Sequence, residues 1–207
     1  MTPVNRVGGR LLIGSVPDII NVNKEDNMDF IILASSMQDE PVFKSRKIYI
    51  PVVAGKRGQS HFLQTILPTA TDFIRDSLAE GKHICIVCES GKDSSVGVAL
   101  AALQLFFQDD GHLAPMDPDS ALIQGAFYFD LPAISCLICI VADKKSIRTR
   151  LEWIIASRPQ ANPSRATLKR VNEFLLSPPS FRRVSPPSCF LYGVKRTQNK
   201  YPEASGA

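Results

Sequence analysis

The chain has 207 residues, of which 44% are hydrophobic and 21% are charged, and its formal net charge is +4. This length suits one well-buried core, and the composition is ordinary for a globular protein. No apolar run preceded by basic residues opens the chain, and its longest apolar segment, Leu131 to Ala142, is about half of what a membrane helix requires. We therefore expect a soluble, cytoplasmic protein with no membrane partner.

The first half of the chain alternates between strand and helix patterns. Short buried strands are expected at Arg10 to Ser15, Asp29 to Ala34 and Lys47 to Val53. A helix is expected from about Ser60 to Glu80, with Pro68 as a point where it can divide in two. This alternation predicts an α/β fold. Its sheet should be mainly parallel, with four to five strands and helices on both faces.

A strand, a short polar loop and a helix then follow one another without interruption. His83 to Cys88 has strand character, Glu89 to Ser95 is a small polar loop, and an apolar helix runs from Val96 to Phe107. Either Ser94 or Ser95 can cap this helix. Free backbone N–H groups and the positive end of the dipole make such a junction a seat for an anion such as phosphate. In a parallel sheet, ligands bind beyond the carboxyl ends of the strands, where this loop lies.

The second half divides into an unpatterned segment, two helices and a tail. The segment from Asp109 to Asp130 is acidic and rich in Gly and Pro, and Leu131 to Ala142 is either one more buried strand or part of an insertion spanning 111–142. Helices are expected from Lys144 to Ser157 and from Asn162-Pro163 onward, with Asn162 as N-cap. Residues 178–207 are expected to form a flexible basic tail after a single domain, 1–177.

The polar loop matches one phosphate-loop family and not another. A nucleoside-triphosphatase loop requires Gly-x4-Gly-Lys-Ser/Thr, which is absent here. The loop of cysteine phosphatases, His-Cys-x2-Gly-x2-Arg-Ser/Thr, is similar in skeleton, since Cys88, Gly91 and Ser95 occupy its Cys, Gly and Ser/Thr positions. Ser94 replaces the Arg that grips phosphate, Val87 replaces the His, and Ala54 stands where the general acid is expected. We therefore expect a phosphatase-like loop without ordinary phosphatase chemistry.

The five cysteines suggest reduced core thiols rather than a metal site. Cys85 with Cys88 and Cys136 with Cys139 have the spacing of zinc ligands. Residues i and i+3 of a strand point to opposite faces, however, and no turn residues separate either pair. No metal site is therefore expected.

Positive charge is concentrated late in the chain. From Lys144 to Arg170 the sequence has eight Lys/Arg and one Glu, whereas residues 1–110 have 11 Lys/Arg and 13 Asp/Glu. This concentration is consistent with a partner that has a phosphate backbone, or with the solvated faces of two amphipathic helices. Trp153, within this region, is either a packing edge of the core or a platform for stacking a base.

Two stretches together resemble a known family. They are CESGKDSSVGVAL (88–100) and IRTRLEWIIASRPQANPSRATLKRVNEFL (147–175). Both are similar to the C-terminal, dual-specificity-phosphatase-like domain of the fungal and plant initiator-tRNA 2′-O-ribosylphosphate transferases. These enzymes transfer a phosphoribosyl group from 5-phosphoribosyl 1-pyrophosphate to a 2′-OH of initiator tRNA. The resemblance covers roughly Arg10 to Leu176, without residues 111–142 and without the large N-terminal domain of the family.

The resemblance implies a transferase domain of cysteine-phosphatase fold that acts on tRNA together with that N-terminal domain, and not a phosphatase. Its partners would be initiator tRNA and the phosphoribosyl donor, with Mg²⁺ accompanying the donor and no tightly bound cofactor. Asp93 would hold the metal-bound pyrophosphate or orient the acceptor hydroxyl as a general base, or else simply cap the helix. Phosphate-binding residues would be Cys88, Glu89, Ser90, Gly91, Lys92, Ser94 and Ser95. RNA-binding residues would be Arg158, Arg165, Lys169 and Arg170.

Two other functions remain open. A phosphatase-like module without catalysis would bind phosphorylated proteins through Lys92 and the loop. An atypical cysteine phosphatase would use Cys88 as its nucleophile despite the missing Arg and general acid.

Overall fold

The central strand β5 (His83–Cys88) ends at the polar loop and lies in the middle of a five-stranded sheet of order β1-β2-β5-β3-β4. The computed structural model describes residues 1–20, 27–36, 45–114 and 142–177. Strand β5 is buried, and its apolar side chains pack into the core on both faces of the sheet. Ile84 and Ile86 belong to one core cluster, and Cys85 and Val87 belong to the other.

The strands other than β5 are β1 (Thr2–Pro3), β2 (Leu11–Ser15), β3 (Met28–Ala34) and β4 (Lys47–Pro51). Strand β1 is antiparallel to β2, and all other pairs are parallel. Cys88 pairs in register with Ser15 of β2 and Leu33 of β3. The carboxyl ends of three strands therefore meet beside the polar loop, and the predicted parallel sheet is confirmed.

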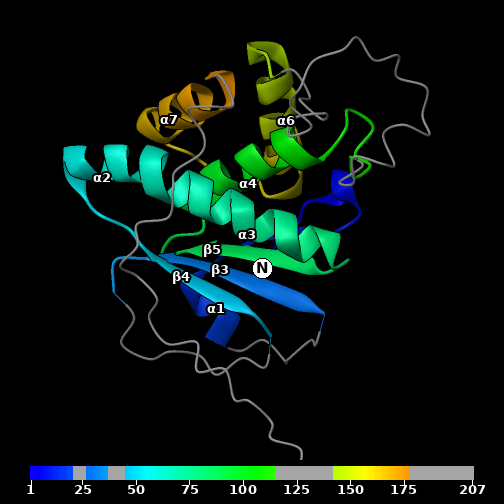
Figure 1. Cartoon of the computed structure of the whole chain (residues 1–207), viewed down its shortest axis with the longest axis horizontal. Helices are drawn as coiled ribbons and strands as arrows, with labels where there is room; N and C mark the ends of the chain where they lie inside the picture. Colours follow the sequence, from blue (N-terminus) through cyan, green and yellow to red (C-terminus); the bar gives the residue numbers. More distant parts are fainter. Residues whose placement is uncertain (21–26, 37–44, 115–141, 178–207) are drawn as a thin grey trace, which may run out of the picture.

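Helices cover both faces of the sheet, as the sequence predicts (Figure 1). Helix α1 (Val16–Ile20) lies on one face over the smaller core cluster. The opposite face carries the larger cluster and the remaining helices. These are α2 (Gly55–His61), α3 (Leu67–Ala79), α4 (Ser94–Phe106), α6 (Lys144–Ser157) and α7 (Arg165–Leu176).

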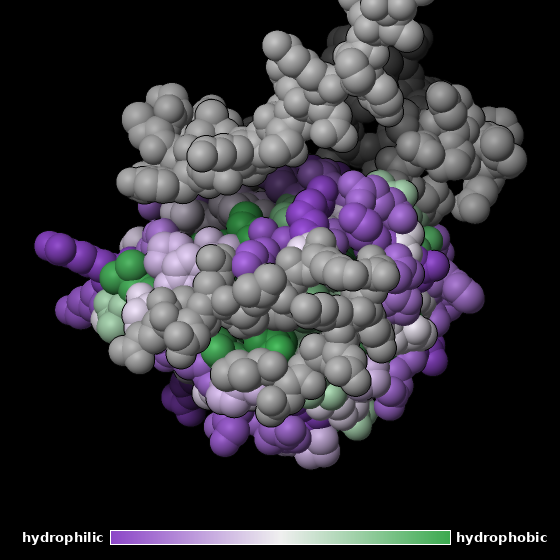
Figure 2. All heavy atoms as spheres, turned by 90° about the horizontal axis from the view of Figure 1, so that it is seen from below, coloured by the Kyte–Doolittle hydropathy of each residue, from purple (hydrophilic) through white to green (hydrophobic). Residues whose placement is uncertain are grey.

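Helix α4 is the central helix of that layer. Its side chains are almost all buried, because it packs against the sheet on one side and against α3, α6 and α7 on the others. The loop that precedes α4 is thus anchored to a helix that is buried on nearly all sides. The outer surface seen from below is mostly hydrophilic, with small hydrophobic areas near its middle (Figure 2).

The helix expected from Ser60 begins earlier, at Gly55, and contains a π-helical turn, η2 (Phe62–Ile66), before α3. Pro68 is the second residue of α3, which comes directly after this π-helical turn, and the helical backbone continues through it. The early start depends on Gly58, because a Cβ at this position would lie 1.7 Å from the Val53 carbonyl oxygen. This close approach folds the β4–α2 connection back onto the helix.

Two helix starts differ from the expectation. The N-cap of α7 is Ser164, whose hydroxyl accepts the Thr167 N–H at 3.1 Å, and not Asn162. The N-cap of α4 is Asp93, which makes no side-chain capping bond, and neither Ser94 nor Ser95 caps the helix. Contacts to other parts of the chain account for both differences, as described below.

Short elements escaped the sequence prediction. Strand β1, helix α1 and the 3-10 turn η1 (Asn5–Val7) are each too short to give a periodic pattern. Most of the segment 111–142 and the whole of 178–207 lie outside the described residues, so the expected insertion and tail stay predictions. Among the described helices, none has the length and apolar character needed to cross a membrane.

Candidate phosphate-binding site

The loop between β5 and α4 turns sharply at Gly91. Its φ of +65° favours glycine, and an added Cβ would lie 2.7 Å from Nη2 of Arg158 and 2.8 Å from the carbonyl carbon of Gly14. Glycine is therefore required both by the backbone conformation and by the close approach of β2 and Arg158. The loop is clamped between the sheet and a side chain that comes from far along the sequence.

The sulfur of Cys88 lies inside this turn. It accepts the Gly91 N–H at 3.2 Å, and the Ser95 hydroxyl is 3.1 Å away. Burial acts to raise the pKa of the Cys88 thiol, but hydrogen bonds from the Ser95 hydroxyl and from the backbone N–H groups of Ser95, Asp93 and Gly91 outweigh it and lower the pKa. The turn thus forms a nest of donors that stabilises negative charge at its centre.

Both carboxylates of the loop are tied to neighbouring elements. Glu89 accepts hydrogen bonds from the hydroxyl and the backbone N–H of Ser35, and these bonds lower its pKa. Asp93 accepts the backbone N–H of Ser164 at 2.8 Å through Oδ1. The interpretation of Asp93 as a simple helix cap is therefore wrong, since its side chain joins the loop to the start of α7.

The segment between α6 and α7 is hydrogen-bonded to successive loop residues. Nε of Arg158 donates to the Gly91 carbonyl at 3.0 Å, and the Asn162 N–H donates to the Lys92 carbonyl at 3.0 Å. With Asp93 bonded to Ser164, this segment is committed to the loop, and α7 starts only after it. Arg158 is 6% exposed, so it is not available as the RNA contact that the sequence suggested.

A cleft of about 440 Å³ lies beside the loop, between the start of α2, the start of α4 and the start of α7. Asp93 and Ser94 line it from the loop side, whereas Cys88 to Lys92 do not. Lys56 and Arg170 line it from α2 and α7, and Asp93 supplies the only carboxylate among the described lining residues. The cleft therefore continues the loop rather than coinciding with it.

Two side chains that a cysteine phosphatase uses in catalysis are replaced by others at this cleft. Ser94 stands at its wall where the loop arginine is expected, and Ala54 is the N-cap of α2 beside it. Lys92 is exposed, and no contact of its ammonium group is found among the described residues. The arrangement can bind an anion and polarise it, but it offers neither a bidentate grip nor a general acid for a leaving group.

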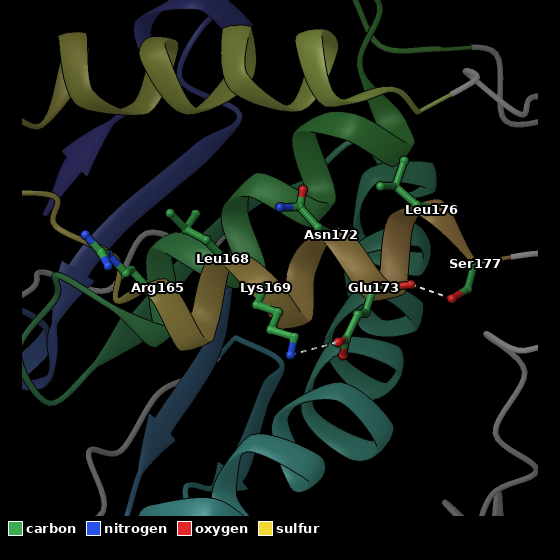
Figure 3. A pocket seen from close by; sticks show the side chains of 7 residues that line it. All are labelled: Arg165, Leu168, Lys169, Asn172, Glu173, Leu176 and Ser177. Atoms are coloured by element: carbon green, nitrogen blue, oxygen red, sulfur yellow. Dashed lines mark hydrogen bonds and ion pairs between the residues drawn. The ribbon is translucent and has the colours of Figure 1, made fainter.

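Helix α7 presents further basic side chains (Figure 3). A shallow groove of about 550 Å³ runs along it, lined among others by Arg165, Lys169 and Glu173. Arg165 is exposed, and Lys169 is 70% exposed with its Nζ 4.0 Å from a Glu173 oxygen. Arg170 is held by Glu173 and by Gln59 of α2. Arg165 and Lys169 are therefore accessible to a partner, and Arg170 faces the cleft.

The surroundings of Trp153 and of the cysteines show how these residues are placed. Trp153 is half-buried, with the guanidinium groups of Arg6 and Arg150 over its ring at 5.4 and 5.2 Å, which makes it a packing edge. Cys85 is buried, and burial raises its pKa to about 12. No cluster of three metal-ligating side chains occurs among the described residues, and Cys136 and Cys139 lie outside them.

Sequence reasoning missed several residues of the site. Lys56 and Gln59 lack an apolar pattern, and their only signal was that Lys56 lies two residues after Ala54, the expected general-acid position. Ser35 makes two hydrogen bonds to the loop, both to Glu89, and Ser164 makes one, to Asp93. No local pattern could have found the two serines, because each partner lies more than 50 positions away.

The fold of this site recurs in known proteins. The structure of human DUSP28 matches with a TM-score of 0.52 and 12% identity over 84% of this chain and 95% of that chain. PTPMT1 matches with a TM-score of 0.50 and 12% identity over 84% and 92%. These likenesses confirm the predicted cysteine-phosphatase fold. No curated protein sequence matches the chain.

A family model identifies the chain more specifically. The model described as the Rit1 DUSP-like domain matches residues 46–175, which is more than half of the chain. This range includes the loop, the cleft, the whole of α6 and all but the last residue of α7. The chain therefore belongs to the Rit1 DUSP-like domain family, whose context is tRNA modification.

Proposed function

We propose that this chain is the phosphate-binding domain of a transferase that moves a 5-phosphoribosyl group from phosphoribosyl pyrophosphate to a 2′-OH of initiator tRNA. The observation that carries the proposal is a loop whose N–H nest is intact around Cys88 while Ser94 and Ala54 replace the groups that hydrolysis needs. A transferase that handles phosphates requires the nest and not the missing groups.

The cleft beside the loop suits the donor. Its volume of about 440 Å³ lies in the range of small-molecule sites, and Lys56 and Arg170 face it with positive charge. A donor with phosphates at both ends of a ribose can place one phosphate at the nest and another near these two side chains. Backbone N–H groups at the starts of α4 and α7 add favourable dipoles.

Asp93 would act on the acceptor or on the metal that accompanies the donor. Its Oδ1 is engaged by the Ser164 N–H, which fixes the carboxylate at the wall of the cleft and leaves Oδ2 for a ligand. One carboxylate suits a Mg²⁺ ion that arrives with a pyrophosphate, since Mg²⁺ is usually bound by one or two carboxylates plus phosphate oxygens. The same oxygen suits a general base for the 2′-OH.

The RNA would lie along α7. Arg165 and Lys169 are exposed on this helix, and Arg170 lies on the same helix at the cleft. Phosphate contacts made by these side chains would place the acceptor ribose next to the donor. This arrangement replaces the expected set of four residues by Arg165, Lys169 and Arg170.

Filter binding of initiator and elongator tRNA across a salt series, with and without the donor and Mg²⁺, tests the proposal. We expect preferential, steeply salt-dependent binding of initiator tRNA. The double variant Arg165→Gln/Lys169→Gln should weaken binding and flatten the salt slope by about two units. Arg148→Gln is the matched control, because Arg148 is exposed on α6 and paired with Glu152.

The proposal is refuted if the intact chain binds neither tRNA nor the donor. Retained donor binding without tRNA binding would restrict the domain to the donor and assign tRNA recognition to another part of the enzyme. The alternative, a phosphatase-like module that binds phosphorylated proteins, rests on the exposed ammonium group of Lys92 beside the loop. It predicts phosphopeptide binding that Lys92→Ala abolishes, with no preference for RNA.

A further inference from the structure

Arg158 is a buried cation with only neutral hydrogen-bond partners. Its guanidinium donates to the Gly91 carbonyl at 3.0 Å, to the Ile13 carbonyl at 3.2 Å and to the Thr2 hydroxyl at 2.8 Å. The residue is 6% exposed, and no carboxylate of the described residues lies within ion-pair distance of it. Among the described residues, therefore, no acid forms an ion pair with Arg158.

The other buried charges are paired. Asp29, which is 1% exposed, has Arg46 at 3.5 Å and Lys82 at 3.7 Å. Arg150, which is fully buried, has Asp109 at 3.0 Å. A buried charge without a counter-charge is strongly unfavourable, so Arg158 stands out among the buried ionic groups of the described chain.

Arg158 lies between the carboxyl end of α6 and the nest. Its own N–H is bonded to Ile154 at the carboxyl end of α6, where the helix dipole supplies about half a negative charge. The nest lies on the other side of Gly91, because Gly91 accepts from Arg158 through its carbonyl and donates to the sulfur of Cys88 through its N–H. A single residue thus separates the guanidinium from the anion site.

We propose that Arg158 is the counter-charge of the phosphate bound in the loop, and that it supplies from behind the loop the positive charge that Ser94 cannot supply from within it. This inference rests on the proposed phosphate-binding function. Arg158 is a positioning residue, since it acts on the phosphate through the Gly91 backbone and through its field. The positive charge of Arg158 behind the loop therefore favours the binding of anions there, and most of all of anions with a higher negative charge.

Titration calorimetry of the full chain with inorganic pyrophosphate tests this role through two substitutions. Arg158→Lys keeps the charge and loses the planar set of hydrogen bonds, whereas Arg158→Gln keeps a donor and loses the charge. We expect the pyrophosphate affinity of Arg158→Lys to stay within about threefold of that of the original chain. The affinity of Arg158→Gln should be about tenfold lower, or lower still. A purely structural role would weaken both variants equally.

Arg150→Gln is the matched control. Arg150 is also buried and also donates to two backbone carbonyls, at 3.1 Å and 2.9 Å, but it lies at the opposite end of α4 from the loop. Its loss should lower the melting temperature while pyrophosphate affinity stays within about threefold. Thr2→Val provides a milder test, because it removes one partner of Arg158 and leaves the charge in place.

The outcomes separate the two levels of inference. If the original chain does not bind pyrophosphate, the phosphate-binding function fails and the role of Arg158 fails with it. If the chain binds and Arg158→Gln binds equally well, or if Lys and Gln lose affinity equally, only the role of Arg158 is overturned. If Arg158→Gln does not fold, Arg158→Lys and Thr2→Val still test the role, because both keep the charge: a tenfold loss of affinity in either variant overturns it.

Discussion

Replacing Gly91 by alanine tests whether the loop is clamped between the sheet and Arg158. Alanine at a φ of +65° costs about 1–2 kcal/mol, because its Cβ crowds the backbone in the left-handed region. The new Cβ would also lie 2.7 Å from Nη2 of Arg158 and 2.8 Å from the backbone of Gly14. Such overpacking costs about 1–3 kcal/mol more, since backbone cannot move aside cheaply.

We therefore expect Gly91→Ala to lower the free energy of unfolding by about 2–5 kcal/mol. For a chain of this size the melting temperature would fall by about 4–20 °C. Gly81→Ala is the control, because Gly81 has a φ of +74° and nothing within 4 Å of an added Cβ. It should cost only the conformational part, about 1–2 kcal/mol.

Urea unfolding and differential scanning calorimetry measure both variants. The difference between them isolates the crowding at the loop, which we expect to be about 1–3 kcal/mol. Equal costs within about 0.5 kcal/mol would mean that the loop yields freely, and the clamped arrangement would be refuted. Weakened pyrophosphate binding by Gly91→Ala, but not by Gly81→Ala, would link the clamp to the anion site.

Two further predictions concern the loop. Asp93→Asn keeps an acceptor for the Ser164 N–H and should change the free energy of unfolding by less than about 0.5 kcal/mol, whereas Asp93→Ala should cost about 1 kcal/mol or more, and both should abolish transfer in the complete enzyme. The lowered pKa of Cys88 contributes stability that is present above the ordinary thiol pKa and lost as the pH falls through the lowered value. Iodoacetamide labelling located by mass spectrometry should therefore detect Cys88 at lower pH than a free thiol, Ser95→Ala should shift that profile to higher pH, and Cys85 should stay unlabelled. Labelling of Cys88 only above the ordinary thiol pKa, or equal stability of Asp93→Asn and Asp93→Ala, would contradict the respective argument.

The loop keeps the backbone architecture of a cysteine-phosphatase loop but not its arginine, and these two properties have different causes. The nest depends on Gly91 and on backbone N–H groups, which any sequence that adopts the turn provides. Hydrolysis depends on side chains at Ser94 and Ala54, which can change without disturbing the turn. The side chains of such a loop can therefore change while its nest of backbone N–H groups is kept.

The sequence by itself determined the elements that bury a continuous apolar pattern. Strand β5 and helix α6 have the bounds that the sequence predicts, and β2 and β3 differ from the prediction by one residue at their starts. The position of the polar loop followed too, because a loop between a buried strand and a buried helix can only lie at the carboxyl edge of a parallel sheet. Hydrophobic periodicity is a local property, so a local reading of the chain captures it.

Only the tertiary structure decided how the polar groups are used. Arg158 belonged to a basic stretch in the sequence and is buried behind the loop, 67 positions from the Gly91 carbonyl that it binds. Asp93 was expected to cap α4 or act in catalysis, and it holds Ser164 at the start of α7. A charged side chain pairs with whatever the fold brings next to it, and no periodic pattern records that partner. The roles of charged residues in this protein therefore follow from which distant segments meet, whereas its strands and helices follow from the order of apolar residues along the chain.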